Sequence, residues 1–345
     1  MLDTHSLSKK LAVWPSDKIV FELAGSPKTS IMTLQTSETP SSLPRVAVLL
    51  ATYNGLAYVA EQVESILKQS SSAVRIFVSD DQSSDGTWQW LQQQAATEPR
   101  IELLPHTLRF GNAAKNFYRL LRDADFTGCD YVALSDQDDI WLENKLSLSI
   151  EKLREHAAAA VSSNVIATWQ DGRKKLIRKS HGQRRLDFLF GSAGPGCTYL
   201  MTRDCAIQLR EFLMRHRTEV DQVQFHDWMI YAWARTHDKQ WHIESTPTML
   251  YRQHQSNEYG ANSGLAAFRR RWSQVRSGWY RRQILQIAQL IADGSTYTAE
   301  SASIVGLINQ GTVLARVRLL MKLRDSRREP KDRALLALAY LLGGI

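Results

Sequence analysis

A dense acidic segment stands near the middle of the chain. Asp136, Asp138 and Asp139 lie within four positions, and carboxylates this close repel one another unless a hard cation neutralises them. Two of them, spaced Asp-x-Asp, can offer oxygens to Mg²⁺ or Mn²⁺ and leave coordination positions for water and diphosphate oxygens. In the alternative, Asp139 caps a helix that starts near Leu142. Taken alone, the segment leaves both interpretations open.

A second acidic pair, Asp80-Asp81, is followed by Gln-Ser-Ser-Asp-Gly-Thr, a run rich in turn-forming residues. One of its carboxylates either belongs to a turn or accepts the N3–H of a pyrimidine base. A buried imide donor needs such an acceptor, because leaving it unpaired costs about 1–3 kcal/mol. Tyr53 then offers a ring on which the base can stack, whereas Asn54-Gly55 alone is only a turn signal.

Two further polar residues stand at the start of expected helices. Asp227, in His226-Asp227-Trp228, precedes a helix expected over 228–235. It either caps that helix or takes a proton from a hydroxyl as a general base, and from its position alone capping is favoured. Lys115 stands where a helix expected over 112–122 begins, so it either faces phosphate beside the helix N-terminus or is a solvated lysine.

Between residues 45 and 155 the sequence predicts strands that alternate with helices, and these elements must position most of the polar residues named above. In parallel α/β sheets, ligands bind beyond the carboxyl ends of the strands. Three polar groups directly follow expected strands: Thr52-Tyr53-Asn54, Asp80-Asp81 and Asp136–Asp139. A strand is also expected at 197–202 and a helix at 204–217, and the chain from Leu265 onward is expected to be helical. Apolar runs and their periodicity predict strands at 46–51, 74–78, 101–104 and 131–134, and helices around 59–67, 87–91 and 112–122.

The composition fits a large α/β domain with an appendage. The 345 residues are 43% hydrophobic, and the formal net charge of +8 is concentrated where Lys and Arg crowd into 173–185 and 269–282. This excess indicates an anionic partner. Three cysteines without metal-ligand spacing favour a reducing compartment, and no window reaches the roughly 18–20 apolar residues of a spanning helix. We therefore expect a cytoplasmic protein, able to rest on the inner face of the cytoplasmic membrane.

The ordered strand-end motifs carry a family resemblance. Ala51–Gly55, Val78–Thr87 and Ser135–Asp139 resemble, in order and spacing, the family 2 glycosyltransferases of the GT-A fold. Gly194–Thr198, His226–Trp228 and Tyr251–Asn257 look like the rhamnosyltransferase-like branch that builds bacterial polysaccharides, and the match covers about 45 to 262. The resemblance implies a Rossmann-like α/β fold with a mainly parallel mixed sheet flanked by helices. The expected parts are a loosely ordered extension at 1–44, the GT-A domain at 45–262 and a helical appendage at 263–345.

The resemblance also implies an activity, an inverting transfer from a nucleoside-diphosphate sugar to a hydroxyl. Enzymatic glycosyl transfer is expected to pass through an oxocarbenium-like state, with Asp227 as the base that deprotonates the acceptor. The donor would be a dTDP- or UDP-sugar, and Mg²⁺ or Mn²⁺ would stabilise the departing diphosphate. The implied metal ligands are Asp136, Asp138 and His254, and the implied nucleotide-sugar contacts are Thr52, Tyr53, Asn54, Asp81, Lys115, Asp136 and Arg252.

The segment 269–282 interleaves arginines with Trp272, Trp279 and Tyr280. This pattern suits an interfacial helix on anionic lipid, a nucleic-acid contact, or a helix packed on the catalytic domain with its guanidinium groups in water. Packing and membrane contact are favoured over nucleic acid, which is not expected as a partner. A membrane contact would fit a saccharide acceptor that is linked to lipid.

Two other classes of protein share parts of this pattern. A phosphoaspartyl receiver also clusters Asp residues and a Lys around Mg²⁺, but its acidic pair follows the first strand, whereas Asp80-Asp81 follow the second. A catalytically inactive relative that binds sugar nucleotide or nucleic acid is the remaining alternative. The sequence therefore predicts a glycosyltransferase that adds rhamnose or another deoxyhexose to a growing surface polysaccharide.

Overall fold

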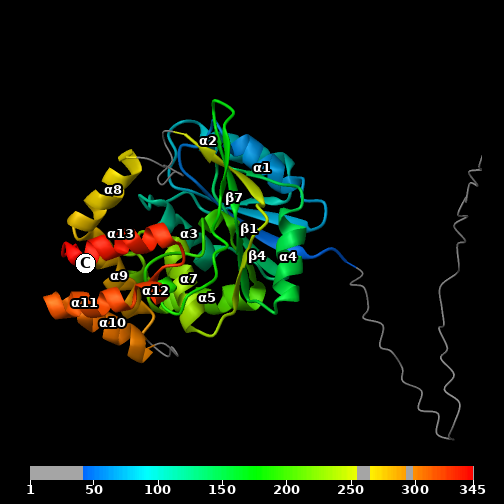
Figure 1. Ribbon diagram of the computed structural model, residues 1–345. Helices are drawn as coiled ribbons and strands as arrows, with labels where there is room; N and C mark the ends of the chain where they lie inside the picture. The colour runs from blue at the N-terminus through cyan, green and yellow to red at the C-terminus, as the bar shows by residue number, and fades with distance from the viewer. Residues whose placement is uncertain (1–41, 255–264, 293–297, 345) are drawn as a thin grey trace, which may run out of the picture. The chain divides into compact units, whose positions relative to one another are not determined.

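The computed structural model describes residues 42–254, 265–292 and 298–344 (Figure 1). The expected extension at 1–44 and residues 255–264 of the expected GT-A domain fall almost entirely outside these ranges. The strands are β1 Arg45–Thr52, β2 Ala73–Asp80, β3 Ile101–Leu103, β4 Tyr131–Ser135, β5 Ile140–Trp141, β6 Ala160–Ser163, β7 Val165–Trp169, β8 Lys174–Ile177, β9 Leu200–Thr202, β10 Trp241–Glu244 and β11 Met249–Gln253.

Helices follow most strands, as the alternating pattern predicts. Two short 3₁₀ turns, η1 Asp187–Leu189 and η2 Gly196–Thr198, flank the loop before β9. The α-helices are α1 Val59–Leu67, α2 Thr87–Thr97, α3 Ala113–Asp123, α4 Lys145–Glu155, α5 Arg203–Arg215, α6 Arg217–Val220, α7 His226–Thr236, α8 Leu265–Arg276, α9 Trp279–Leu290, α10 Thr298–Gln310, α11 Val313–Met321, α12 Leu323–Ser326 and α13 Pro330–Leu341.

The main sheet has seven strands in the order β10-β6-β9-β4-β1-β2-β3. β1 pairs in parallel with β2 on one side and β4 on the other, while β9 runs antiparallel between β4 and β6. The expected mainly parallel mixed sheet is therefore confirmed. Because β1, β2 and β4 point the same way, the residues that follow their carboxyl ends meet at one edge of the sheet.

The central strand β1 explains why helices cover both faces of the sheet. Its residues from Val46 onward are buried, and successive side chains point to opposite faces. Ala47 and Leu49 join one hydrophobic cluster with α3, α5 and α7, while Val48 and Leu50 join another with α1 and α4. Figure 1 shows these two groups of helices on opposite sides of the central strands.

The structure differs from the sequence-based expectation in three places. A second sheet, β5-β11-β7-β8, was not predicted; its strands are short and make long-range pairs that local periodicity does not reveal. The strand expected at 197–202 is shorter in the structure and consists of β9 alone. Pro195 opens a 3₁₀ turn before it, in which Thr198 donates its N–H to the Pro195 carbonyl at 3.0 Å. The helix expected near Leu142 begins three residues later, at Lys145.

The C-terminal helices share a core with the sheet. Ile284, Ile304, Leu319 and Leu336 belong to the same hydrophobic cluster as Leu49, so the helical region from α9 onward completes one face of the α/β fold. Within the described ranges, none of the helices is both long enough and apolar enough to cross a bilayer.

Residues Trp279 and Tyr280 attach this helical region to the α/β part of the chain. Trp279 donates its indole N–H to the Gln224 side chain at 2.8 Å, and the Tyr280 hydroxyl donates to the Phe190 carbonyl at 2.6 Å. Arg327 in turn donates to the Tyr280 oxygen at 3.0 Å. These contacts favour the packing interpretation for the aromatic residues of 269–282, whereas the side chains of residues 270 and 271 lie outside the described part.

We predict that Tyr280→Phe lowers the free energy of unfolding by about 1–3 kcal/mol, because the buried Phe190 carbonyl then loses its donor. Chemical denaturation of the full chain measures the change. Tyr131→Phe is the matched control, since the Tyr131 hydroxyl makes no hydrogen bond to the described part of the chain. Equal effects of the two substitutions would show that the Tyr280 hydroxyl does not stabilise the fold.

Candidate active site

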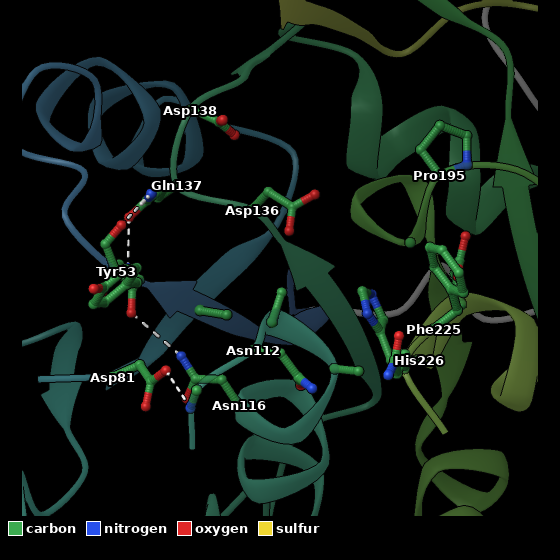
Figure 2. Close-up of a pocket in the computed structure, with 18 of the residues that line it drawn as sticks. Tyr53, Asp81, Asn112, Asn116, Asp136, Gln137, Asp138, Pro195, Phe225 and His226 are labelled. Atoms are coloured by element: carbon green, nitrogen blue, oxygen red, sulfur yellow. Dashed lines mark hydrogen bonds between the residues drawn. The ribbon is translucent and has the colours of Figure 1, made fainter. Parts of the chain in front are cut away.

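A cavity of about 470 Å³ opens where β1, β2 and β4 end (Figure 2). It brings together six of the residues that the sequence singled out, and Asn54, Lys115, Arg252 and His254 do not line it. The walls are formed by Ala51, Thr52, Tyr53, Asp81, Arg109, Gly111, Asn112, Ala113, Ala114, Asn116, Asp136, Gln137, Asp138, Pro195, Gly196, Gln224, Phe225, His226, Asp227 and Tyr251.

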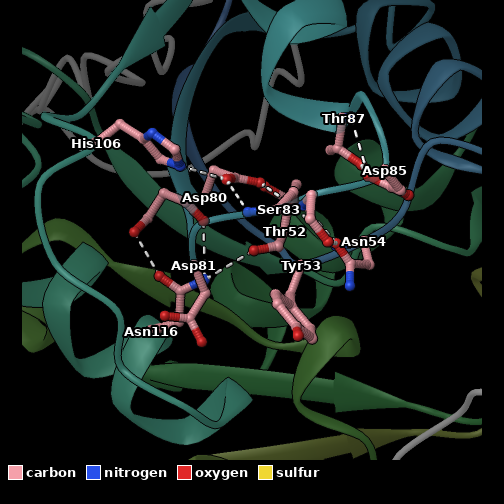
Figure 3. A network of polar contacts seen from close by, with 12 residues as sticks. Thr52, Tyr53, Asn54, Asp80, Asp81, Ser83, Asp85, Thr87, His106 and Asn116 are labelled. Carbon is pink, nitrogen blue, oxygen red and sulfur yellow. Dashed lines mark hydrogen bonds and ion pairs between the residues drawn. The ribbon is translucent and has the colours of Figure 1, made fainter.

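The wall at the end of β2 is built around Asp81. Its carboxylate accepts the backbone N–H of Phe110 and, at 2.8 Å, that of Gly111, so it holds the loop that leads into α3. Asp80 is buried beside it and accepts from Thr52, Ser83 and His106 (Figure 3). These bonds fix the end of β2 and leave Asp81 at the cavity surface.

Tyr53 stands at the mouth of this wall with 42% of its surface exposed. The Arg109 guanidinium donates to its hydroxyl at 2.9 Å and lies 5.4 Å from its ring centre. An aromatic ring with a cation beside it is a surface on which a flat base can stack. Arg109 was not predicted as a site residue, because a single arginine in a loop carries no signal of its own.

The Gln137 side chain joins the ends of β1 and β4. Its Oε1 accepts the Tyr53 N–H at 2.8 Å, and its Nε2 donates to the Tyr53 carbonyl, also at 2.8 Å. This close contact requires glycine at position 55, where a Cβ atom would lie 2.1 Å from Gln137 Oε1. Asn54 bonds Ser83 and Ser84, so in the structure it shapes the loop beside the cavity.

The N-terminus of α3 faces the same cavity. Asn112 caps the helix by accepting the Lys115 N–H at 2.8 Å, and Gly111 through Ala114 line the wall. Free N–H groups at a helix N-terminus attract anions, which is the feature expected of a phosphate contact. The Lys115 side chain is half-buried and lies outside the lining.

Asp136 and Asp138 lie on the cavity wall between the β1 loop and the loop that carries Pro195, as Figure 2 shows. His254 Nε2 lies 2.8 Å from the Asp138 Oδ2 atom, and its ring stacks on Tyr58 at 4.5 Å. Asp138 and His254 therefore meet, as a shared metal site requires. Arg252 instead forms an ion pair with Glu61 at 2.5 Å.

Asp139 is fully buried and does not cap a helix, so that interpretation was wrong. Helix α4 begins at Lys145, with Asn144 at its cap position. One Asp139 oxygen accepts the Arg252 N–H at 3.1 Å, and the Cys197 thiol lies beside the same carboxylate. Burial, together with the charges of Asp138 and Asp136, raises the pKa of Asp139 well above its usual value.

Asp136, Asp139 and Cys197 could also hold an ion, since one ligand atom from each lies within 4.8 Å of the others. Burial raises the pKa of the Cys197 thiol well above its usual value, so without an ion bound the sulfur is protonated. Mg²⁺ and Mn²⁺ prefer oxygen to a protonated thiol. Asp136 and Asp138 offer carboxylate oxygens on the cavity wall, although in the described part of the chain their ligand atoms and that of His254 do not all lie within 4.8 Å of one another.

Asp227 also lines the cavity and lies in the first turn of α7. The helix has Phe225 at its cap position and no side-chain cap bond, so the capping alternative is not realised. Burial raises the pKa of Asp227 to about 6, although hydrogen bonds from Ser192 and the Trp228 N–H oppose this shift. A carboxylate with this pKa is poised to accept a proton near neutral pH.

His226 and its neighbours complete this side of the cavity and were not assigned from the sequence. The His226 ring stacks on Phe117 at 4.0 Å, and burial lowers its pKa to about 3, so it is neutral. Its Nε2 atom faces Gly196, where a Cβ would lie only 2.2 Å away. Gly196 belongs to the motif Gly194–Thr198 noted in the sequence, and the close packing of His226 against it leaves no room for a side chain.

The turn between α12 and α13 holds the loop that carries Ser192. Arg328 donates to the Ser192 carbonyl and lies 3.5 Å from the carboxylate of buried Asp187. Asp187 is also bonded by Tyr231 at 3.1 Å and Arg235 at 2.9 Å. Residues distant in sequence therefore fix the loop beside Asp227.

Comparison with known proteins agrees with this geometry. A family model described as Glycosyl transferase family 2 matches residues 47–217. The dTDP-rhamnosyl transferase RfbG of Shigella flexneri is 41% identical over 247 residues, which cover 71% of this chain and 86% of that protein. The putative teichuronic acid biosynthesis glycosyltransferase TuaG of Bacillus subtilis is 32% identical over 129 residues, covering 37% of this chain and 50% of that protein.

The fold has relatives among solved structures. S. aureus TarS 1–349 in complex with UDP-GlcNAc superposes with a TM-score of 0.53 at 14% identity, covering 87% of this chain and 82% of that chain. The same domain in complex with UDP gives a TM-score of 0.52. The resemblance inferred from the strand-end motifs is confirmed: the chain belongs to the family 2 glycosyltransferases of the GT-A fold, in their rhamnosyltransferase-like branch.

Proposed function

We propose that this glycosyltransferase moves rhamnose or another deoxyhexose, with inversion, from a dTDP- or UDP-linked donor to a hydroxyl of a growing surface polysaccharide. One observation carries the proposal: Asp81, Asp136, Asp138 and Asp227 all line a single cavity. Similarity to a dTDP-rhamnosyl transferase supports the choice of sugar. Release of diphosphate nucleotide from a panel of sugar nucleotides tests it, and equal turnover of all sugars would contradict the choice.

The donor nucleotide fits the wall formed by Tyr53 and Asp81. The two bonds that Asp81 accepts from backbone N–H groups leave lone pairs on its oxygens, so it can still accept a base N3–H while the base stacks on Tyr53. The N-terminus of α3 then faces the diphosphate. Thr52 lines this wall, whereas contacts from Asn54, Lys115 and Arg252 stay predictions.

Asp136, Asp138 and His254 would hold the divalent cation. When bound, the cation would neutralise negative charge on the departing diphosphate. This assignment is supported by the position of both carboxylates on the cavity wall and by the 2.8 Å approach of His254 to Asp138.

Asp227 would act as the general base. Its carboxylate takes the proton of the acceptor hydroxyl while that oxygen bonds to the anomeric carbon from the face opposite the diphosphate. The bond from the anomeric carbon to the diphosphate oxygen breaks, and its electron pair leaves with the nucleotide. Attack from the opposite face inverts the anomeric configuration. Pro195, Gly196 and Phe225 would position the acceptor, because they line the cavity around Asp227.

The acceptor would be a saccharide linked to lipid, handled by a cytoplasmic enzyme at the membrane surface. We predict that the arginines of the basic segment 269–282 contribute to that association. Its residues Trp279 and Tyr280 instead contact the α/β part of the chain.

Asp227→Asn should abolish transfer and leave nucleotide affinity nearly unchanged, because an amide cannot take the proton. In the parent enzyme, kcat/KM should rise about tenfold per pH unit up to about pH 6, where Asp227 loses its proton, and then level off. Steady-state kinetics and calorimetric nucleotide binding measure both quantities. Unaltered turnover of Asp227→Asn would refute the assignment of the base.

Asp227→Asn should have opposite effects on stability and on activity. The ordinary pKa of this carboxyl is 3.8, and burial raises it to about 6 in the folded chain. The unfolded chain thus loses the proton first, so ionised Asp227 destabilises the fold increasingly between about pH 4 and 6. Asp227→Asn should therefore raise the free energy of unfolding at pH 8 by an amount on the order of 2 kcal/mol, and leave it nearly unchanged at pH 4.

His254→Ala should lower the affinity for Mn²⁺ in the presence of nucleoside diphosphate by about 10-fold or more, and Asp138→Asn by at least as much. Cys197→Ser is the matched control, because the alternative ion site would include the Cys197 sulfur. Titration calorimetry measures the affinities. A large loss for Cys197→Ser with none for His254→Ala would place the ion at the buried site instead.

A further inference from the structure

Exposed apolar side chains are concentrated on the C-terminal helices. Twelve large apolar residues are exposed in the described part of the chain, and half of them lie on α11 and at the end of α13. Val313 and Met321 are 77% and 78% exposed. Contiguous apolar surface of this kind marks an interaction site more often than scattered single residues do. We call this surface the α11 face; it consists of Val313, Leu314, Val317, Met321, Leu341 and Leu342.

Helix geometry places four of these residues side by side. At about 100° per residue, Val313, Leu314, Val317 and Met321 fall within an arc of about 100°. Ala315 and Leu319 fall on the opposite side of the helix and are buried, so they attach α11 to the core. The helix therefore has two apolar sides, and the described residues of the chain bury one of them.

The end of α13 lies beside this helix. A Cβ atom at Gly343 would lie 2.7 Å from a guanidinium nitrogen of Arg316, so the residues that close α13 contact α11. Leu341 and Leu342, 60% and 62% exposed, thereby extend the apolar surface. Figure 1 shows both helices on the side of the molecule away from the sheet.

The surroundings of the α11 face are basic. Between residues 298 and 344 the chain has eight Lys or Arg and four Asp or Glu. Arg318 borders the apolar arc, about 40° beyond Leu314 on the helix surface, and its side chain is exposed. Glu300 is paired with Arg185 and Lys322, so it is already neutralised by neighbouring cations.

We propose that the α11 face binds the surface of an anionic lipid bilayer. Apolar side chains flanked by cations are the requirement for a helix that lies in the headgroup region, where apolar burial and attraction to acidic lipid act together. A second copy of this chain is less suited, because a symmetric contact would bring the same basic borders together. The inference rests on the proposed function in one respect: membrane binding would bring the cavity to a lipid-linked acceptor.

Co-sedimentation of the full chain with vesicles tests the proposal. Vesicles containing phosphatidylglycerol should bind the protein at least tenfold better than vesicles of phosphatidylcholine alone. The triple variant Leu314→Ser, Val317→Ser, Met321→Ser should lose at least tenfold in partitioning, and Arg318→Glu should weaken binding to anionic vesicles only. Met214→Ser is the matched control, since Met214 is 62% exposed on α5 and should leave binding unchanged.

Unchanged partitioning of the triple variant would overturn the proposal. If the triple variant binds like the parent chain and binding is lost instead in Arg281→Glu, Arg282→Glu, the membrane contact lies in 269–282 alone, which also overturns the proposal. A parent chain that is dimeric in analytical ultracentrifugation and becomes monomeric in the triple variant would assign the face to self-association. Donor hydrolysis without vesicles is measured for each variant, so loss of lipid binding is distinguished from failure of the glycosyltransferase activity.

Discussion

The bidentate bond between Gln137 and the backbone of Tyr53 is the interaction on which the site depends. A primary amide can satisfy an N–H and a carbonyl of one residue at once, and here it does so across the ends of two parallel strands. The bond fixes the distance between the wall that bears Tyr53 and the wall that bears Asp136. A Cβ atom at position 55 would displace the Gln137 amide and so break this bond, because the amide occupies that space.

A second constraint comes from the far end of the chain. The buried carboxylate of Asp187 is neutralised partly by Arg328, and the same arginine holds the loop whose Ser192 bonds Asp227. Leaving a buried charge without its partner is strongly destabilising. The C-terminal helices, which lie beyond the residues matched by the family model, are therefore part of the support for the proposed catalytic carboxylate.

Features encoded within a few adjacent residues could be predicted from the sequence. The strands that end at Thr52, Asp80 and Ser135 follow from short apolar runs, and parallel order places their polar residues at one edge. The meeting of His254 with Asp138 was inferred only through family resemblance. Features that depend on long-range pairing were not predictable: the second sheet, the burial of Asp139, and the contact between His226 and Gly196 appear only when distant segments pack together.

The position of β9 has a consequence for how the chain is made. Residues near 200 insert between β4 and β6, so the sheet cannot close while only the first half of the protein has left the ribosome. The cluster that contains Leu49 is completed still later, by Ile284 and Leu336. Because domains tend to fold from the N-terminus as they are synthesised, the nascent chain must carry an incomplete apolar face through most of translation, and chaperones have the greatest opportunity to bind it in that interval.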